Sequence, residues 1–259
     1  MKLSVPYIPD PFFLQYLGKK APCLESVYFG LFEGPLLDGR VRFASISLKT
    51  LAKDLSSLSR VKKYLLLNTR FIHPALYRDE DFLSQTLDRI ELLHESCGLE
   101  GLVFSDFFLI KGLDATGRDI LSKLQAVPGI NTMIDSFPKA LSFWEAVAQT
   151  RFRHPEKILV DRGLNRSPKA LEALVGEIKR ADPCMGIELL ANEGCLFQCP
   201  FKLTHDAQIS LSNTGLVKEA TFGLSQALGC HAEFYDRPWT FLKSPFIRPE
   251  DIHYYRGLA

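Results

Sequence analysis

The chain has 259 residues, of which 46% are hydrophobic and 24% are charged, a composition typical of a protein that can bury a sizeable core. Its 31 lysines and arginines balance 30 aspartates and glutamates, so the formal net charge is +1. This balance excludes a strongly basic nucleic-acid-binding protein, and a nucleic acid would have to be recognised through a local patch.

Strand-like apolar runs alternate with helix-like amphipathic runs along the first two hundred residues. The expected strands are 3–8, 26–32, 63–69, 101–105, 131–135, 157–160 and 186–191, and the expected helices are 48–58, 79–95, 116–124, 139–149 and 167–180. In the segment 81–93, apolar residues recur at spacings of three and four, which predicts one buried stripe on a helix. Repeated alternation of this kind indicates parallel βα units.

The absence of a linker rich in glycine, serine or proline favours a single domain over residues 1–259. We expect the α/β class and a β/α (TIM-like) barrel, in which 1–200 supplies regular βα units. Residues 201–259 would form a cysteine-containing, irregular closing region with an aromatic tail, and 207–212 or 229–234 could supply an eighth strand. An open doubly wound sheet is the alternative, although no G-x-G-x-x-G motif follows the first strand.

Polar residues follow several of the expected strands. In a β/α barrel the carboxyl ends of the strands form the active face, so these residues are candidates for substrate binding. They are Asn68, Arg70, Asp106, Asp161, Arg162, Asn165, Arg166 and Asn192. Two arginines on the loop 161–166 suit an anionic substrate, because a guanidinium group presents a planar fork of donors. Each residue could instead cap a helix, and an ion pair from Asp161 to an arginine could simply organise the loop.

Two cysteines and a histidine follow the last expected strand. Cys195 and Cys199 would lie one helical turn apart if their segment is helical, so both sulfurs could face one centre. Cys230 is a third thiol, in a region without core periodicity. In a long chain without a secretory signal, such thiols favour metal binding over disulfides. We therefore expect Cys195, Cys199 and Cys230 to bind a metal centre, with His205, Cys23 or an exogenous group as the fourth ligand.

Two kinds of metal centre are compatible with this spacing. Zinc suits three cysteines and a histidine, but the usual pair of compact knuckles is absent. A 4Fe-4S cluster tolerates scattered ligands, and three thiolates would leave one iron open for substrate. Glu193 and His205 are the candidate catalytic residues for proton transfer, and Glu193 would be the general base of a zinc hydrolase.

Several short motifs together resemble peptidase family U-32, the collagenase-like proteases. They are 26–31 (SVYFGL), 66–69 (LLNT), 101–106 (GLVFSD), 158–164 (ILVDRGL) and the cysteine segment. The resemblance spans roughly residues 20 to 235. It implies a β/α barrel and a cysteine-bound four-iron cluster, which relatives use in oxygen-independent hydroxylation of ubiquinone precursors or RNA bases.

The chain departs from the family pattern at two places. The family typically has a His-Gly-Ala segment before its first motif cysteine, where this chain reads Ala191-Asn192-Glu193-Gly194. The downstream cysteines also do not reproduce a four-cysteine spacing. The sequence therefore resembles a divergent branch of the family.

Three functions are compatible with these features. The first is an iron-sulfur enzyme that modifies a polar or anionic substrate, such as a small-molecule quinone precursor or an RNA base. The second is a zinc-binding hydrolase or peptidase, although H-E-x-x-H is absent. The third is a non-catalytic barrel that acts as a protein partner subunit and docks through its aromatic tail. Without a signal sequence or an apolar run near ~20 residues, we expect a cytoplasmic protein with no membrane span.

Overall fold

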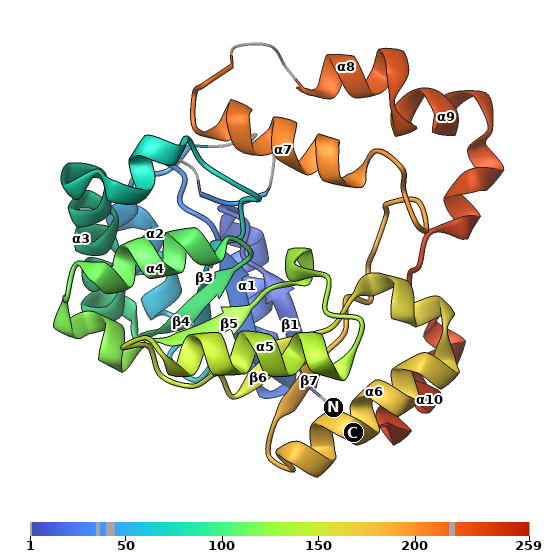
Figure 1. The fold of residues 1–259 in the computed structure, drawn as a ribbon, viewed down its shortest axis with the longest axis horizontal. Helices are drawn as coiled ribbons and strands as arrows, with labels where there is room; N and C mark the ends of the chain where they lie inside the picture. Colours follow the sequence, from blue (N-terminus) through green and yellow to red (C-terminus); the bar gives the residue numbers. More distant parts are fainter. Residues whose placement is uncertain (1, 35–36, 40–44, 218–220, 259) are drawn as a thin grey trace.

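The computed structural model describes residues 2–34, 37–39, 45–217 and 221–258. Parallel β-strands lie at its centre, with helices around them (Figure 1). One sheet pairs its strands in chain order: β1 (Leu3–Pro6), β2 (Leu24–Phe29), β3 (Lys62–Leu67), β4 (Leu99–Phe104) and β5 (Gln125–Pro128). A second, two-stranded sheet pairs β6 (Lys157–Leu159) with β7 (Gly186–Glu188). The mixed α/β class with a parallel sheet is therefore confirmed.

The two sheets are connected by isolated contacts at two places, between β5 and the segment before β6 and between β1 and β7. Gln125 of β5 forms an isolated parallel bridge with Arg153, just before β6. On the other side, the Ser4 hydroxyl of β1 donates to the Glu188 carboxylate of β7 at 3.0 Å. Among the described residues no backbone ladder joins β1 to β7. The closed barrel accordingly stays a prediction.

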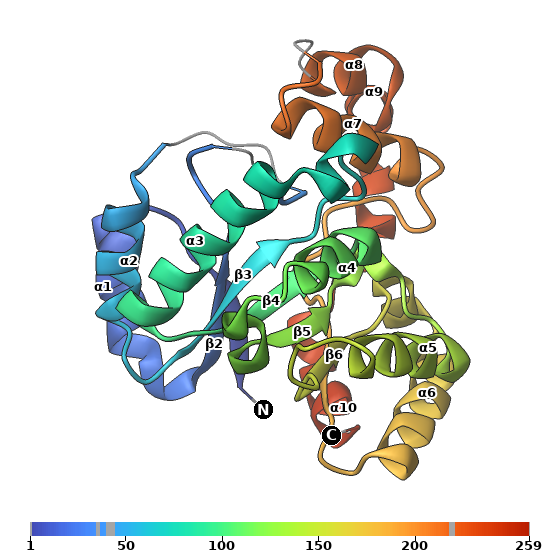
Figure 2. The ribbon, with the colours of Figure 1, turned by 60° about the vertical axis from the view of Figure 1, so that its left-hand side comes forward.

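Six helices follow the strands in the first part of the chain. They are α1 (Pro11–Lys20), α2 (Leu48–Ser56), α3 (Glu80–Cys97), α4 (Phe107–Ala115), α5 (Phe137–Ala148) and α6 (Pro168–Ala181). Figure 2 shows α1, α2 and α3 beside the strands β2 and β3. In β3, Leu65 and Leu67 pack toward these helices, whereas Tyr64 and Leu66 belong to a separate inner cluster. Burial on both faces is typical of parallel strands.

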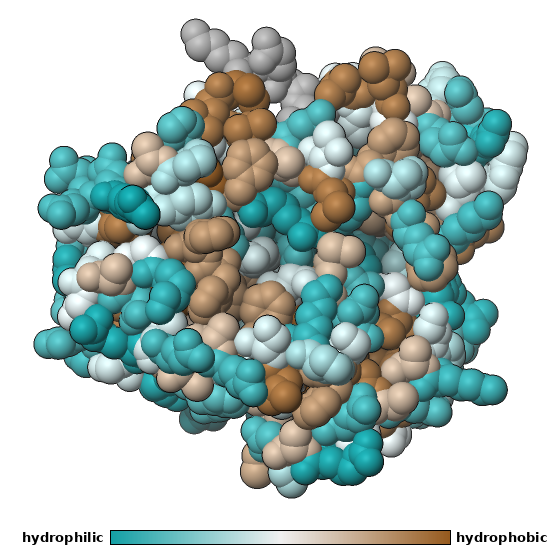
Figure 3. All heavy atoms as spheres, viewed as in Figure 1, coloured by the Kyte–Doolittle hydropathy of each residue, from teal (hydrophilic) through white to brown (hydrophobic). Residues whose placement is uncertain are grey.

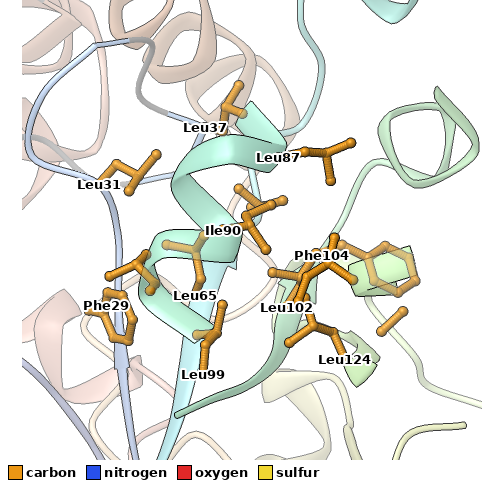
Figure 4. Close-up of a cluster of buried hydrophobic side chains, with 14 of the residues drawn as sticks. Phe29, Leu31, Leu37, Leu65, Leu87, Ile90, Leu99, Leu102, Phe104 and Leu124 are labelled. Atoms are coloured by element: carbon orange, nitrogen blue, oxygen red, sulfur yellow. The ribbon is translucent and has the colours of Figure 1, made fainter. Parts of the chain in front are cut away.

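Helix α3 shows how the sequence specifies these elements. Asp79 caps its first turn by accepting a hydrogen bond from the Phe82 amide at 2.9 Å, and Gly98 ends it with a left-handed φ of 70°. Between these ends, Leu87 and Ile90 are fully buried against the sheet (Figure 4). The predicted apolar stripe is confirmed.

The region between β4 and β6 differs from the prediction. The helix expected at 116–124 is absent: α4 lies earlier, Gly117 has a left-handed φ of 74°, and only a short 3-10 helix (Asp119–Lys123) follows. The fifth strand is Gln125–Pro128 rather than 131–135. The helix α4 could not be recognised from a helical repeat, because its sequence is mostly apolar and such a repeat is visible only when polar residues occupy the opposite face.

The C-terminal region is helical and supplies no eighth strand in the part that the structure describes. The segments 207–212 and 229–234 lie in α7 (Lys202–Asn213) and α9 (Cys230–Asp236), with α8 (Thr221–Leu228) between them. Figure 1 shows these three helices grouped apart from the strands, while α10 (Ile252–Gly257) lies beside α6. The strand expectation was therefore wrong. The buried residues of α7 are Asp206, Ile209 and Ser210, and the last two follow Asp206 by three and four positions, the spacing of one helix face.

The group α7–α9 buries few apolar side chains. Ile209 is the buried apolar residue of α7, whereas Leu203 and Leu228 are 62% and 74% exposed. Figure 3 shows hydrophobic side chains at the surface over this part of the molecule. The position of the group α7–α9 therefore depends largely on the polar contacts that α7 makes with the strand ends, which are described below. Among the described residues, no helix combines the length and apolar character needed to cross a membrane.

Candidate functional site

A chain of hydrogen bonds links four polar residues beyond the carboxyl ends of the strands. Arg162, directly after β6, donates to the Glu193 carboxylate at 2.5 Å and to the Asn131 side-chain oxygen at 2.8 Å. Asn131 in turn donates to the backbone carbonyl of Asn68, after β3, at 3.3 Å. We call Asn68, Asn131, Arg162 and Glu193 the mouth cluster. Parallel strands end at one edge, which is why residues so far apart in sequence meet here.

The centre of the mouth cluster is a buried ion pair. The side chains of Arg162 and Glu193 are 13% and 6% exposed. Burial alone would raise the pKa of Glu193, but the Arg162 charge and the Cys195 amide, which donates at 2.8 Å, hold that pKa below its usual range. Glu193 is therefore an ionised carboxylate held between a guanidinium group and a backbone amide.

A second charged group ties α7 to the end of β3. The Arg70 side chain donates to the Asp206 carboxylate at 3.0 Å, and Lys202 bonds the other oxygen of the same carboxylate. The Ser210 hydroxyl accepts a hydrogen bond from the Arg70 amide at 3.0 Å. One nitrogen of Arg70, Nη2, is sealed from solvent and has no partner. These contacts place α7 over the mouth cluster's side of the sheet.

Asp106 and Asp161 make the capping contacts that were the alternative interpretation. Asp106 accepts from the Phe108 amide at 3.0 Å and also bonds the Tyr77 hydroxyl. Burial raises the pKa of Asp106, against the opposing effect of these hydrogen bonds. Asp161 accepts from the Gly163 amide at 2.7 Å and organises its own loop. Neither of these two hydrogen bonds is made to a residue of the mouth cluster, although Asp161 caps the short 3-10 helix that begins at Arg162.

Asn165 and Arg166 hold the C-terminal tail in place. Asn165 donates to the carbonyl oxygens of Leu190 and Pro245, at 3.0 and 2.7 Å. Arg166 donates to the Ser244 carbonyl at 2.5 Å, and its guanidinium group lies 5.2 Å from the centre of the Phe246 ring. Asn192 is exposed. Of the eight predicted substrate-binding residues, the structure therefore brings Asn68 and Arg162 into the mouth cluster and Arg70 to its α7 side.

Cys195 and Cys199 lie in a loop between β7 and α7 rather than on a helical turn. Burial and the neighbouring Glu193 carboxylate raise the pKa of Cys195 to about 11. Burial also raises the pKa of Cys199, and part of the rise comes from Cys230, which begins α9. The fold thus brings Cys199 near Cys230, while Cys195 faces Glu193.

The described residues do not assemble a metal site. Among them, no group of three or more histidine, cysteine, aspartate or glutamate side chains is arranged to bind one metal ion. Cys23 lies directly before β2, at the opposite end of the strands from Cys195. Burial lowers the pKa of His205. A bound metal would itself deprotonate a coordinating thiol, so the raised pKa of Cys195 describes the thiol without a metal and is no measure of ligation.

Asn131 is the residue of the mouth cluster that the sequence did not single out as a ligand-binding candidate. It was hidden because 131–135 was interpreted as a strand. With the strand correctly placed at β5, Asn131 becomes a polar residue just after a strand end, the same signal that identified Asn68 and Arg162.

Comparison with known proteins finds a relative in sequence and solved structures with a related fold. The chain is 26% identical over 166 residues to the uncharacterized protease MJ1657 of Methanocaldococcus jannaschii, and the match covers 64% of this chain and 44% of that protein. The chain thus corresponds to less than half of that relative's length. No family model matches the chain.

The structure of the U32 peptidase Mk0906 has a similar fold. The two structures align with a TM-score of 0.59 and 15% sequence identity, covering 85% of this chain and 80% of the other. At this identity the likeness concerns the fold. The sequence relative and the shared fold together confirm the resemblance predicted from the sequence motifs: this chain is similar in fold to a U32 peptidase and, over 166 residues, similar in sequence to an uncharacterized protease.

Proposed function

We propose that this chain is an enzyme whose active site is the mouth cluster, and that it binds a polar or anionic substrate there. The observation that carries the proposal is the buried pair of Arg162 and Glu193 at the carboxyl ends of the strands. A buried ion pair gives little net stability, because each charge loses its hydration. Its place at the face where β/α barrels carry their active sites supports a role in binding or chemistry. A barrel closed between β1 and β7 is part of the same proposal.

The substrate class that the site suits best contains an amide or a carboxylate. The names of both similar proteins, a protease and a peptidase, support a peptide. In this proposal the Arg162 guanidinium group binds a carbonyl or carboxylate oxygen of the substrate, and Asn131 orients that guanidinium group. The ionised Glu193 accepts a proton from the attacking water molecule and returns it to the amine nitrogen that leaves as the C–N bond breaks. His205, half-buried on α7 next to Asp206, is the second candidate for moving a proton.

The proposal is tested with the full chain and a mixture of synthetic peptides of known sequence, analysed by mass spectrometry. We expect the wild type to cleave or retain a subset of the peptides, and Glu193→Gln to abolish cleavage. Arg162→Lys keeps the charge but loses the planar fork, so it should weaken binding. Glu250→Gln, at an exposed tail position, is the control and should behave as wild type. Unchanged cleavage and retention in Glu193→Gln would contradict the proposal.

A second candidate is the iron-sulfur enzyme predicted from the sequence. The observation that favours it is the proximity of Cys199 and Cys230, which come from separate elements. Anaerobic purification should then give a brown protein with about four irons per chain, and Cys199→Ser or Cys230→Ser should lose the iron. Zinc in place of iron would favour the hydrolase alternative. A colourless, metal-free protein after cluster reconstitution would exclude both centres.

A further inference from the structure

A hollow of about 380 Å³ lies at the amino ends of β3 and β4, at the opposite end of the strands from the mouth cluster. The loop after α2, the start of β3 and the end of α3 surround it. The polar side chains that matter for its chemistry are Ser59, Arg60, Lys62, Lys63, Ser96 and Glu100. None of them belongs to the proposed active site.

Lys63 is the unusual residue of this hollow. It is only 4% exposed, on the outward side of β3 beside Leu65. Its ammonium group has no hydrogen bond or ion pair among the described residues. The Nζ atom nevertheless keeps some contact with solvent, because it is absent from the buried side-chain atoms that lack a partner. The ammonium group therefore faces the hollow. A buried cation without a partner is costly, because it loses hydration and gains no compensating contact.

The other charges around Lys63 leave the hollow positive. Lys62 is neutralised by Glu156 and Glu25, at 2.7 and 3.4 Å. Glu100 accepts hydrogen bonds from Gln125 and Arg153 and is neutralised in turn.

Arg60 is exposed and, like Lys63, has no ion pair or hydrogen bond from its side chain among the described residues. The ends of α2 and α3 contribute about half a negative charge each, so two free cations leave a net charge of roughly +1. The thiol of Cys97 lies near Lys63 and is not ionised at neutral pH, because burial raises its pKa to about 11.

Hydroxyl groups complete the set of donors. Ser59 and Ser96 are exposed at the rim, and neither side chain makes a hydrogen bond in the described structure. Lysine and arginine together with hydroxyl donors are a usual environment for a phosphate group. We propose that this hollow binds a phosphate group, held by Lys63 from below and by Arg60, Ser59 and Ser96 at the rim.

Burial lowers the pKa of the Lys63 ammonium group. A bound dianion would oppose that effect and keep Lys63 charged. Binding would therefore relieve an unfavourable feature of the unliganded fold, which is the physical reason to expect affinity at this position rather than at any exposed lysine.

The test measures thermal unfolding of the full chain with inorganic phosphate against sodium chloride at matched ionic strength. We expect phosphate at ten times its Kd to raise the Tm by roughly 3–6 °C. Lys63→Met should have a higher Tm than wild type without phosphate and should lose the phosphate-dependent rise. Lys169→Met, at an exposed position of α6, is the matched control and should keep the full rise.

Arg60→Gln gives a second, independent variant, since this exposed side chain has no structural contact to lose. It should reduce the phosphate-dependent rise to less than half without changing the Tm in chloride. Absence of any phosphate-specific rise in the wild type would overturn the proposal. A full rise in Lys63→Met, or in Arg60→Gln if Lys63→Met does not fold, would overturn it as well.

Discussion

Removing Arg162 should reveal how much the buried ion pair of the mouth cluster matters for stability. In Arg162→Met, the Glu193 carboxylate keeps only the Cys195 amide as a partner and stays almost fully buried. An uncompensated buried charge typically costs about 3–5 kcal/mol. For a chain of this size that corresponds to a fall in Tm of roughly 6–20 °C.

Urea unfolding of Arg162→Met, Glu193→Gln and the double variant provides the assay, as a double-mutant cycle. The loss of unfolding free energy in the double variant should be about 1–3 kcal/mol smaller than the sum of the two single losses, because each single substitution leaves the other partner without its hydrogen bond. Arg248→Met is the control: its pair with Asp251 is exposed and screened by solvent, so its loss should cost much less than the loss of the buried pair. The reasoning is refuted if Arg162→Met costs no more than this control, or if the two single costs simply add.

Four further substitutions test the fold. Gly101→Ala would place a Cβ atom 2.6 Å from the Gln125 carbonyl oxygen of β5, so it should lower the free energy of unfolding in urea by about 1–3 kcal/mol. Gly176→Ala has open space around it in α6 and should raise the free energy of unfolding by about 0.5–1 kcal/mol. Equal effects of the two substitutions would contradict the tight packing of β4 on β5. Burial raises the pKa of Cys97 to about 11 in the folded chain, so its contribution to stability is present below about pH 9 and is lost as the pH rises toward 11. Between pH 8 and 11, the free energy of unfolding of Cys97→Ala should therefore fall by about 1–3 kcal/mol less than that of the wild type. Parallel pH profiles of the two proteins would refute this. Asp79→Ala removes the cap of α3 and should cost about 1 kcal/mol by thermal unfolding, while no change would show that the cap is dispensable.

Local patterns determined most of the strand and helix positions. The stripe of α3, its Asp79 cap and the apolar runs of β1 to β4 are readable because each depends on residues close in sequence. The same local signals failed between β4 and β6, where α4 is apolar on nearly all sides. They failed again after Cys199, where short runs of mixed character could be strand or helix until packing decided between them.

The sequence by itself determined the chemical groups that follow each strand, and with them the presence of Arg162 and Glu193 at one face. It also carried the motifs of the U32 resemblance. Only the tertiary structure decided which groups meet. Asn131 joins Arg162, α7 brings Asp206 to Arg70, and Cys195 turns toward Glu193 rather than toward the other two thiols. These pairings join residues many positions apart, and their geometry depends on where each strand ends and how the helices pack, which no local pattern records.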